Sequence, residues 1–80
     1  MEDKNYQAIV EKVISGRHGE YCHTRSKELG SVTFSLDVWQ EKIKPEPGTY
    51  VMLSQVFKKR AGWRAASARF LQPSDETRED

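Results

Sequence analysis

The segment Ser31–Leu36 alternates strictly between apolar and hydroxylated side chains. Val32, Phe34 and Leu36 stand at every second position, and a serine or threonine stands at each position between. Because successive side chains of a β-strand point to opposite faces of a sheet, this period of two predicts a strand. One face of that strand should pack in a core, and the other should carry hydroxyl groups toward solvent.

Two further segments with strand character precede it. Tyr6–Ile14 is rich in β-branched residues and stops at Ser15 and Gly16, which favour a turn. Its apolar positions also fit a helix, but the neighbouring segments favour the strand. Gly19–Thr24 is short, with Tyr21 and His23 alternating against Glu20 and Cys22, and a polar stretch follows it. We therefore expect three strands in the first half of the chain.

The second half predicts two more strands. Thr49–Phe57 alternates again, a basic loop follows at Lys58–Gly62, and Trp63–Leu71 returns with small residues. Such a loop between two strand patterns is typical of a hairpin. The residues of this hairpin that we expect to face inward are Val51, Leu53 and Phe57.

One short helical turn is expected between the third and fourth strands. Asp37–Lys44 has Asp37 as a possible N-cap, and its apolar residues fall on one side of a helix. Pro45–Gly48 forbids continuation of a helix and predicts a turn. Five short strands without a long helix indicate an all-β protein that forms a small barrel. An SH3-like barrel has the same number of strands and remains an alternative at this point.

The chain has 80 residues, which is the size of one small domain, and 36% of them are hydrophobic, so the core must be thin. We expect residues 6–72 to form the barrel. Residues 1–5 are predicted to be a disordered N-terminus, and residues 73–80 a disordered acidic tail. No apolar run approaches the length of a membrane helix, and the first residues do not resemble a signal peptide. These features favour a cytoplasmic or nuclear protein.

The formal charge of +1 conceals a segregation of charge along the chain. Residues 4–70 carry a balance of +6, residues 1–3 carry −2, and residues 71–80 carry −3. The basic residues concentrate between Gln55 and Phe70, where no acidic residue occurs. Clustered cations of this kind neutralise phosphates, and interleaved aromatic rings can stack on unpaired bases.

Candidate contacts to nucleic acid follow from this pattern. The cations of the last hairpin would contact phosphates, and Trp63 either offers a ring to a base or folds against the barrel. Tyr21 is a second candidate for stacking. Phe34 is a third, although strict alternation favours its burial, and Trp39 is interpreted as a core residue. The complete set of candidate residues is Lys12, Arg17, Tyr21, His23, Phe34, Lys58, Lys59, Arg60, Trp63, Arg64 and Arg69.

Other chemistries have little support in the sequence. His18, Cys22 and His23 are potential zinc ligands, but the chain has no further cysteine or histidine to complete a site. Cys22 cannot form an internal disulfide, and no third group is evident that would orient a histidine beside it for catalysis. We expect no enzyme activity, no metal and no cofactor.

The last hairpin resembles that of cold-shock domains, which are five-stranded OB-fold nucleic-acid binders. In those domains a glycine opens the fourth strand, "G-x-x-V-x-F" runs along it, a basic loop containing glycine follows, and "A-x-x-V-x-x-L" closes the barrel. Ala8–Val13 is similar to the first strand of the family, "G-x-V-x-x-F". The matching residues of the hairpin are Gly48, Val51, Leu53, Gly62, Ala65, Ala68 and Leu71.

The binding motifs of the family are only partly present. Cold-shock domains carry "K-G-F-G-F-I" on the second strand and "V-F-V-H-F" on the third. Here His18–Cys22 and Val32–Leu36 stand in those places, with one aromatic residue in each, and Ser35 stands where the family has its histidine. The resemblance implies an OB-type barrel with a short helical turn between strands 3 and 4. It also implies a binder of single-stranded RNA or DNA, with RNA favoured.

The alternative function is that of an adaptor barrel that contacts a larger protein or complex through the same hairpin. We expect no membrane and no small-molecule substrate as a partner. A modest affinity for nucleic acid is expected, because two aromatic positions of the family's motifs are lost and each stacked base contributes only about 1–3 kcal/mol.

Overall fold

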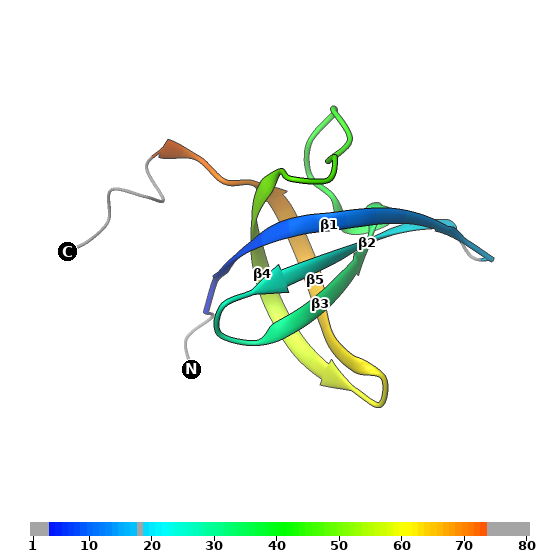
Figure 1. Cartoon of the computed structure of the whole chain (residues 1–80), viewed down its shortest axis with the longest axis vertical. Coiled ribbons are helices and arrows are strands. Elements are labelled where there is room, and N and C mark those ends of the chain that lie inside the picture. Colours follow the sequence, from blue (N-terminus) through cyan, green and yellow to red (C-terminus); the bar gives the residue numbers. More distant parts are fainter. Residues whose placement is uncertain (1–3, 18, 74–80) are drawn as a thin grey trace.

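The computed structural model describes residues 4–17 and 19–73, and these form five strands and one short 3₁₀ turn (Figure 1). No helix within this part of the chain is long and apolar enough to cross a membrane. The predictions made for residues 1–3 and 74–80 and for His18 lie outside the described residues. The elements are β1 (Tyr6–Gly16), β2 (Gly19–Ser26), β3 (Gly30–Ser35), η1 (Leu36–Val38), β4 (Tyr50–Lys59) and β5 (Gly62–Phe70).

The strands close into a barrel in the order β1-β2-β3-β5-β4, with β4 returning to β1. All neighbouring pairs are antiparallel except β3 and β5, which run parallel where Val32 and Thr33 meet Trp63 and Arg64. This arrangement confirms the predicted OB-type barrel, in which β5 lies between β3 and β4. The β1–β2 and β4–β5 hairpins extend beyond the body of the barrel (Figure 1).

The core is small and consists mainly of aliphatic residues. Val32 and Phe34 are buried as the alternation predicted, and Leu36 packs against the core at the start of η1. Two polar residues of the described chain, Thr24 and Ser26, are also buried, and the Thr24 hydroxyl donates a hydrogen bond of 2.7 Å to the Val32 carbonyl. That bond removes the cost of burying an unpaired hydroxyl. The buried apolar residues are Ala8, Val10, Cys22, Val32, Phe34, Val51, Leu53, Ala65 and Ala68.

The helical turn between β3 and β4 is shorter and earlier than predicted. Ser35 caps it, and its hydroxyl accepts a hydrogen bond of 3.2 Å from the backbone N–H of Asp37. The prediction of Asp37 as the N-cap was therefore wrong. The turn ends at Trp39, which has extended backbone and bridges to Ala68 on β5, where Gln40 N–H donates to the Ala68 carbonyl at 2.9 Å. Pairing with β5 thus replaces further helical hydrogen bonds.

Trp39 is partly buried and packs against the core, which agrees with its interpretation as a core residue. Its ring stacks on Phe34 with centroids 5.8 Å apart, and it meets the Phe70 ring edge-on at 4.9 Å. The indole N–H donates a hydrogen bond of 2.8 Å to the Ile43 carbonyl. The apolar body of Trp39 is therefore packed while its polar atom is satisfied.

The alternation along β4 breaks at Gln55, which has a φ of +52°. Residues in this left-handed region do not continue the regular pleat of a strand. Val51 and Leu53 are buried as predicted, but beyond Gln55 it is Val56 that packs against the core. Phe57 is 41% exposed, so its predicted inward orientation was wrong.

Candidate nucleic-acid interface

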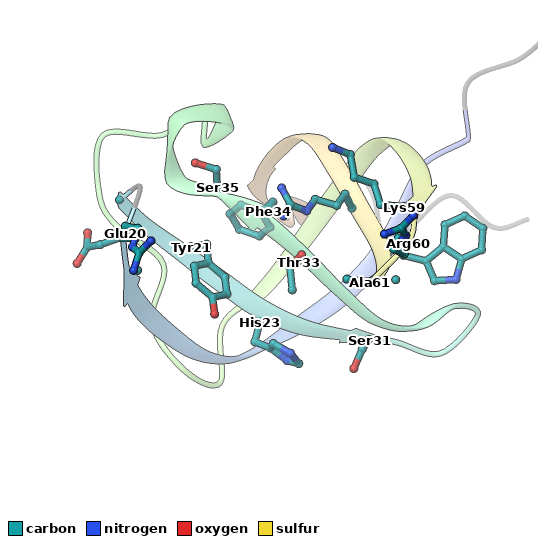
Figure 2. A pocket seen from close by; sticks show the side chains of 16 residues that line it. Glu20, Tyr21, His23, Ser31, Thr33, Phe34, Ser35, Lys59, Arg60 and Ala61 are labelled. Atoms are coloured by element: carbon teal, nitrogen blue, oxygen red, sulfur yellow. The ribbon is translucent and has the colours of Figure 1, made fainter.

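A groove with a volume of about 750 Å³ lies between the two extended hairpins (Figure 2). We call it the main groove. Its walls are the β1–β2 turn and the tip of the β4–β5 hairpin, and its floor is the exposed face of β2 and β3. This is the surface that OB-type barrels present between their first and last hairpins.

Strand register explains the chemistry of the floor. On β2, Tyr21 lies opposite Ser35 and His23 lies opposite Thr33, and all four line the main groove. Cys22 between them points into the core. The solvent face of the alternating segment on β3 therefore supplies hydroxyl groups, which Figure 2 shows beside Tyr21 and His23.

The walls of the main groove are basic. Arg17 stands at the β1–β2 turn, and Lys59, Arg60 and Arg64 stand on the β4–β5 hairpin. Glu20 is the one carboxylate among the described residues that line the groove, and it accepts a hydrogen bond of 2.7 Å from Lys44 Nζ. The main groove therefore favours an anionic ligand.

Two aromatic rings border the main groove and retain exposed surface. Tyr21 lies on the floor and Trp63 lies at the base of the opposite hairpin, and both are half-buried. Lys58, the cross-strand partner of Trp63, holds its ammonium 5.2 Å from the centre of the indole ring. A ring and a cation at this spacing resemble the combination that single-strand binders use for base and phosphate.

Phe34 differs from these two rings because it belongs to the core. Only 1% of its surface is exposed, and Trp39 stacks on it from the side of the η1 turn. It touches the main groove only as part of the floor. The expectation of burial was correct, and the alternative stacking role of Phe34 is not supported.

Three of the predicted contact residues lie outside the lining of the main groove: Lys12, Lys58 and Arg69. Lys12 is exposed on β1 directly opposite His23, so it borders the floor. Arg69 lies five residues beyond Arg64 on β5, a distance of about 17 Å along a strand. It faces Met52 on β4 and donates a hydrogen bond of 3.1 Å to the Phe70 carbonyl. Arg69 therefore lies away from the residues that line the main groove, because membership of one hairpin does not bring both ends of a strand together.

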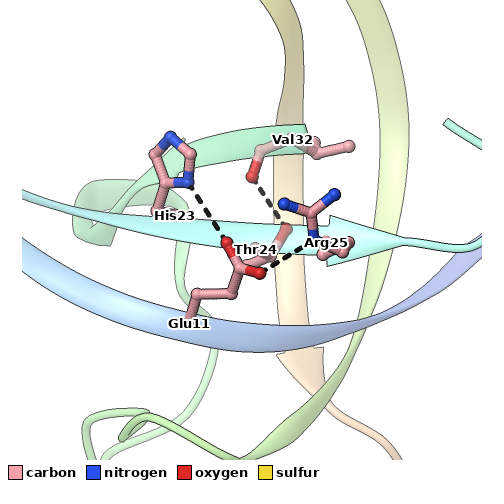
Figure 3. Close-up of polar contacts among 5 residues, drawn as sticks. All are labelled: Glu11, His23, Thr24, Arg25 and Val32. Atoms are coloured by element: carbon pink, nitrogen blue, oxygen red, sulfur yellow. Dashed lines mark hydrogen bonds and ion pairs between the residues drawn. The ribbon is translucent and has the colours of Figure 1, made fainter. Parts of the chain in front are cut away.

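A polar cluster beside His23 was not predicted from the sequence. A bulge in β1 leaves Glu11 as an extra residue between Val10 and Lys12, which pair with Thr24 and His23. Its carboxylate accepts a hydrogen bond of 2.8 Å from Arg25 Nε and lies 3.7 Å from His23 Nδ1 (Figure 3).

This cluster changes the pKa of the Glu11 carboxyl group. The hydrogen bond from the Arg25 guanidinium holds the pKa of Glu11 below its ordinary value of 4.5. No local sequence signal marks this cluster, since it depends on the bulge and on the register between β1 and β2.

The structure also bears on two other candidate chemistries, the reactivity of the Cys22 thiol and the binding of a metal ion. Burial raises the pKa of the Cys22 thiol to about 11, and the nearby Glu20 carboxylate adds to the effect. The thiol is therefore protonated near neutral pH and shielded from solvent. Residues 4–17 and 19–73 contain no group of three histidine, cysteine or acidic side chains placed to hold a metal ion.

Comparison with known proteins does not assign the chain to a family. No model of a known protein family matches the chain, and no curated protein matches it at a significant level. The functional interpretation therefore depends on the residues and geometry described above.

Proposed function

We propose that this protein is a non-catalytic binding module for single-stranded nucleic acid, with RNA preferred to DNA. The observation that carries the proposal is the main groove, in which basic walls and two half-exposed rings surround a hydroxylated floor. The sequence resemblance to cold-shock domains points to the same class of ligand. Function does not follow from the barrel alone, because OB-type barrels serve many partners.

The basic side chains supply the phosphate contacts in this proposal. Arg17 lies on one wall, and Lys59, Arg60 and Arg64 lie on the other. A backbone that threads between the walls would release condensed counterions as each phosphate is neutralised. Tyr21 and Trp63 would each stack on one base, which is a contact that tolerates any base identity.

The proposed preference for RNA is based on the hydroxyl groups that β3 contributes to the floor of the main groove. On β3 the floor carries the hydroxyl groups of Ser31, Thr33 and Ser35, and the Ser35 hydroxyl also accepts the capping hydrogen bond from Asp37 N–H. A ribose 2′-hydroxyl both donates and accepts hydrogen bonds, and it is the group by which a protein tells RNA from DNA. A hydroxyl side chain can serve as its partner in either direction.

Titration with oligouridine and oligothymidine tests the proposal. Binding should quench tryptophan fluorescence, and the affinity should fall with salt with a log–log slope of about −0.7 for each phosphate contacted. Oligouridine should bind more tightly than oligothymidine of equal length. Absence of binding to either oligonucleotide at low salt would overturn the proposal.

Matched charge variants locate the binding surface. Arg60→Ala should weaken binding and lower the salt slope, because Arg60 lines the main groove. Lys42→Ala removes the same charge from an exposed residue of the η1–β4 loop that does not line the groove. Equal effects of the two substitutions would indicate a nonspecific attraction rather than a site.

A second candidate function is an adaptor that binds an acidic protein through the β4–β5 hairpin. The observation that favours it is Phe57, which is 41% exposed and has Lys59 Nζ 5.7 Å from its ring centre. Aromatic residues such as phenylalanine are enriched in the cores of protein interfaces. Phe57→Ala should abolish such an interaction and leave oligonucleotide binding in the main groove unchanged.

A further inference from the structure

A second groove lies at the other end of the β1–β2–β3 face. Its volume is about 500 Å³, and it is formed by the start of β1, the β2–β3 turn and the start of β4. Tyr50 stands at its side with 54% of its surface exposed. The exposed part of this residue is available to a ligand.

Strand register connects the two grooves. Tyr50 lies opposite Ile9, Ile9 lies opposite Arg25, and Arg25 lies opposite Ser31. Directly paired residues project from the same face of a sheet, so these four form one row across four strands. Three strand spacings measure about 14 Å. Ser31 lines the main groove and its neighbour Gly30 lines the second groove, so the two surfaces meet at the start of β3.

The charged side chains among the described residues that line the second groove are basic, as on the walls of the main groove, and one of them is paired with a carboxylate. Arg25 and Lys27 are the charged residues among those that line it, and both are basic. The Arg25 side chain is 60% exposed, and its Nε is fixed by the hydrogen bond to Glu11. Because Glu11 engages Nε, the guanidinium is held in place between the two grooves.

The walls of the second groove are preformed by backbone and side-chain hydrogen bonds. The N–H of Val10 donates to the Thr49 carbonyl at 2.8 Å, and the N–H of Leu71 donates to the Tyr50 carbonyl at 3.1 Å. On the other side, the buried Ser26 hydroxyl accepts the backbone N–H of Glu28 at 3.1 Å and shapes the β2–β3 turn. A ligand therefore meets an ordered surface and loses little binding energy in ordering it.

We propose that the second groove is a further subsite for the strand that occupies the main groove. The strand leaves the main groove at Ser31, passes a phosphate over Arg25, and stacks a base on Tyr50, with Lys27 near the next phosphate. This inference rests on the proposed function, since it extends the path of the same ligand. It predicts a binding site longer than the main groove alone provides.

The experiment compares short and long oligouridines by fluorescence anisotropy. An oligomer of about four nucleotides fills the main groove alone, and one of about twelve reaches both grooves, within the range of site sizes known for OB folds. Tyr50→Ala should weaken binding of the long oligomer by roughly 5- to 150-fold, the effect of losing one stacked base. It should leave the affinity for the short oligomer unchanged.

Two matched variants and one salt series complete the test. Tyr50→Phe keeps the ring and should bind the long oligomer as the natural protein does. Ile43→Ala removes another exposed apolar side chain, 72% exposed and outside both grooves, and should have no effect. Lys27→Ala should lower the magnitude of the log–log salt slope by about 0.7 for the long oligomer only.

The outcomes separate the two proposals. If the short oligomer binds and Tyr50→Ala leaves the long oligomer unaffected, the second subsite is disproved and the main groove stands. An equal loss for both oligomers would also overturn the subsite, because Tyr50 would then act through the main groove. If the natural protein binds neither oligomer, the proposed function fails and the subsite fails with it.

Discussion

Lys58 Nζ lies 5.2 Å from the centre of the Trp63 ring, across the paired strands of the β4–β5 hairpin. A cation over an aromatic ring contributes about 0.5–1 kcal/mol at an exposed site. The pair therefore helps to hold the indole at the edge of the main groove, where Trp63 is half-buried. The ring also packs against the core, so its position does not depend on Lys58 alone.

Replacement of Trp63 should weaken binding more than replacement of Lys58. Trp63→Ala removes a stacking surface and should cost about 1–3 kcal/mol in the free energy of oligouridine binding. Lys58→Ala should reduce mainly the salt slope, because the loss is one of charge. Anisotropy titrations at two salt concentrations measure both effects. Unchanged affinity of a folded Trp63→Ala protein would exclude the indole from the interface.

Loss of the Phe34 ring should destabilise the barrel strongly. The ring is 1% exposed and carries the stacked indole of Trp39, so Phe34→Ala leaves a cavity that neighbours cannot fill. Such substitutions lower the free energy of unfolding by about 3–5 kcal/mol. Urea denaturation followed by circular dichroism measures the change. Ser31→Ala on the solvent face of the same strand should stay within about 0.5 kcal/mol of the natural protein.

The thiol of Cys22 should be unreactive in the folded protein. It is fully buried, and burial raises its pKa to about 11, so the thiolate is scarce at neutral pH. A chromogenic disulfide reagent at pH 8 should label it quickly in denaturant and only slowly under native conditions. Rapid labelling of the native protein would contradict the burial of β2 against the core.

The Glu11–Arg25 pair should make stability depend on acid pH. Because the Arg25 hydrogen bond lowers the pKa of Glu11 in the folded state, the unfolded chain binds more protons in acid. The pair therefore contributes its stabilisation above the ordinary pKa of 4.5, and this is lost as pH falls through the lower folded value.

Substitution and NMR titration test this dependence. Glu11→Gln and Arg25→Ala should both flatten the fall of unfolding free energy below about pH 4.5. An NMR titration of the Glu11 carboxyl carbon should give a pKa below 4.5. A value at or above it would show that the ion pair does not form in solution.

Local patterns in the sequence were enough to predict the elements of this fold. The alternation in Ser31–Leu36 correctly identified the buried Val32 and Phe34, and the turn residues Pro45–Gly48 separated the last hairpin from the rest. These predictions succeed because strand alternation and turn chemistry depend on neighbouring residues alone. The basic character of the hairpin was likewise visible in the sequence.

The predictions that failed depended on backbone geometry and pairing that the alternation of side chains does not reveal. Phe57 is exposed because the left-handed Gln55 changes which side chains of β4 face the core. Asp37 does not cap the turn because the Ser35 hydroxyl does, and Trp39 and Gln40 pair with Ala68, which lies far away in the sequence, in place of continuing the helix. Neither the backbone angle of Gln55 nor the pairing with Ala68 follows from the alternation of side chains.

The sequence by itself determined the five strands, the apolar face that fills the core and the cations of the last hairpin, since each follows from local periodicity or composition. Only the tertiary structure decided which of these residues meet. Barrel closure places Tyr21 and the hydroxyls of β3 opposite Lys59 and Arg60, and it leaves Arg69 outside. It also aligns Tyr50 with Arg25 through Ile9, because strand register joins residues that no local pattern relates.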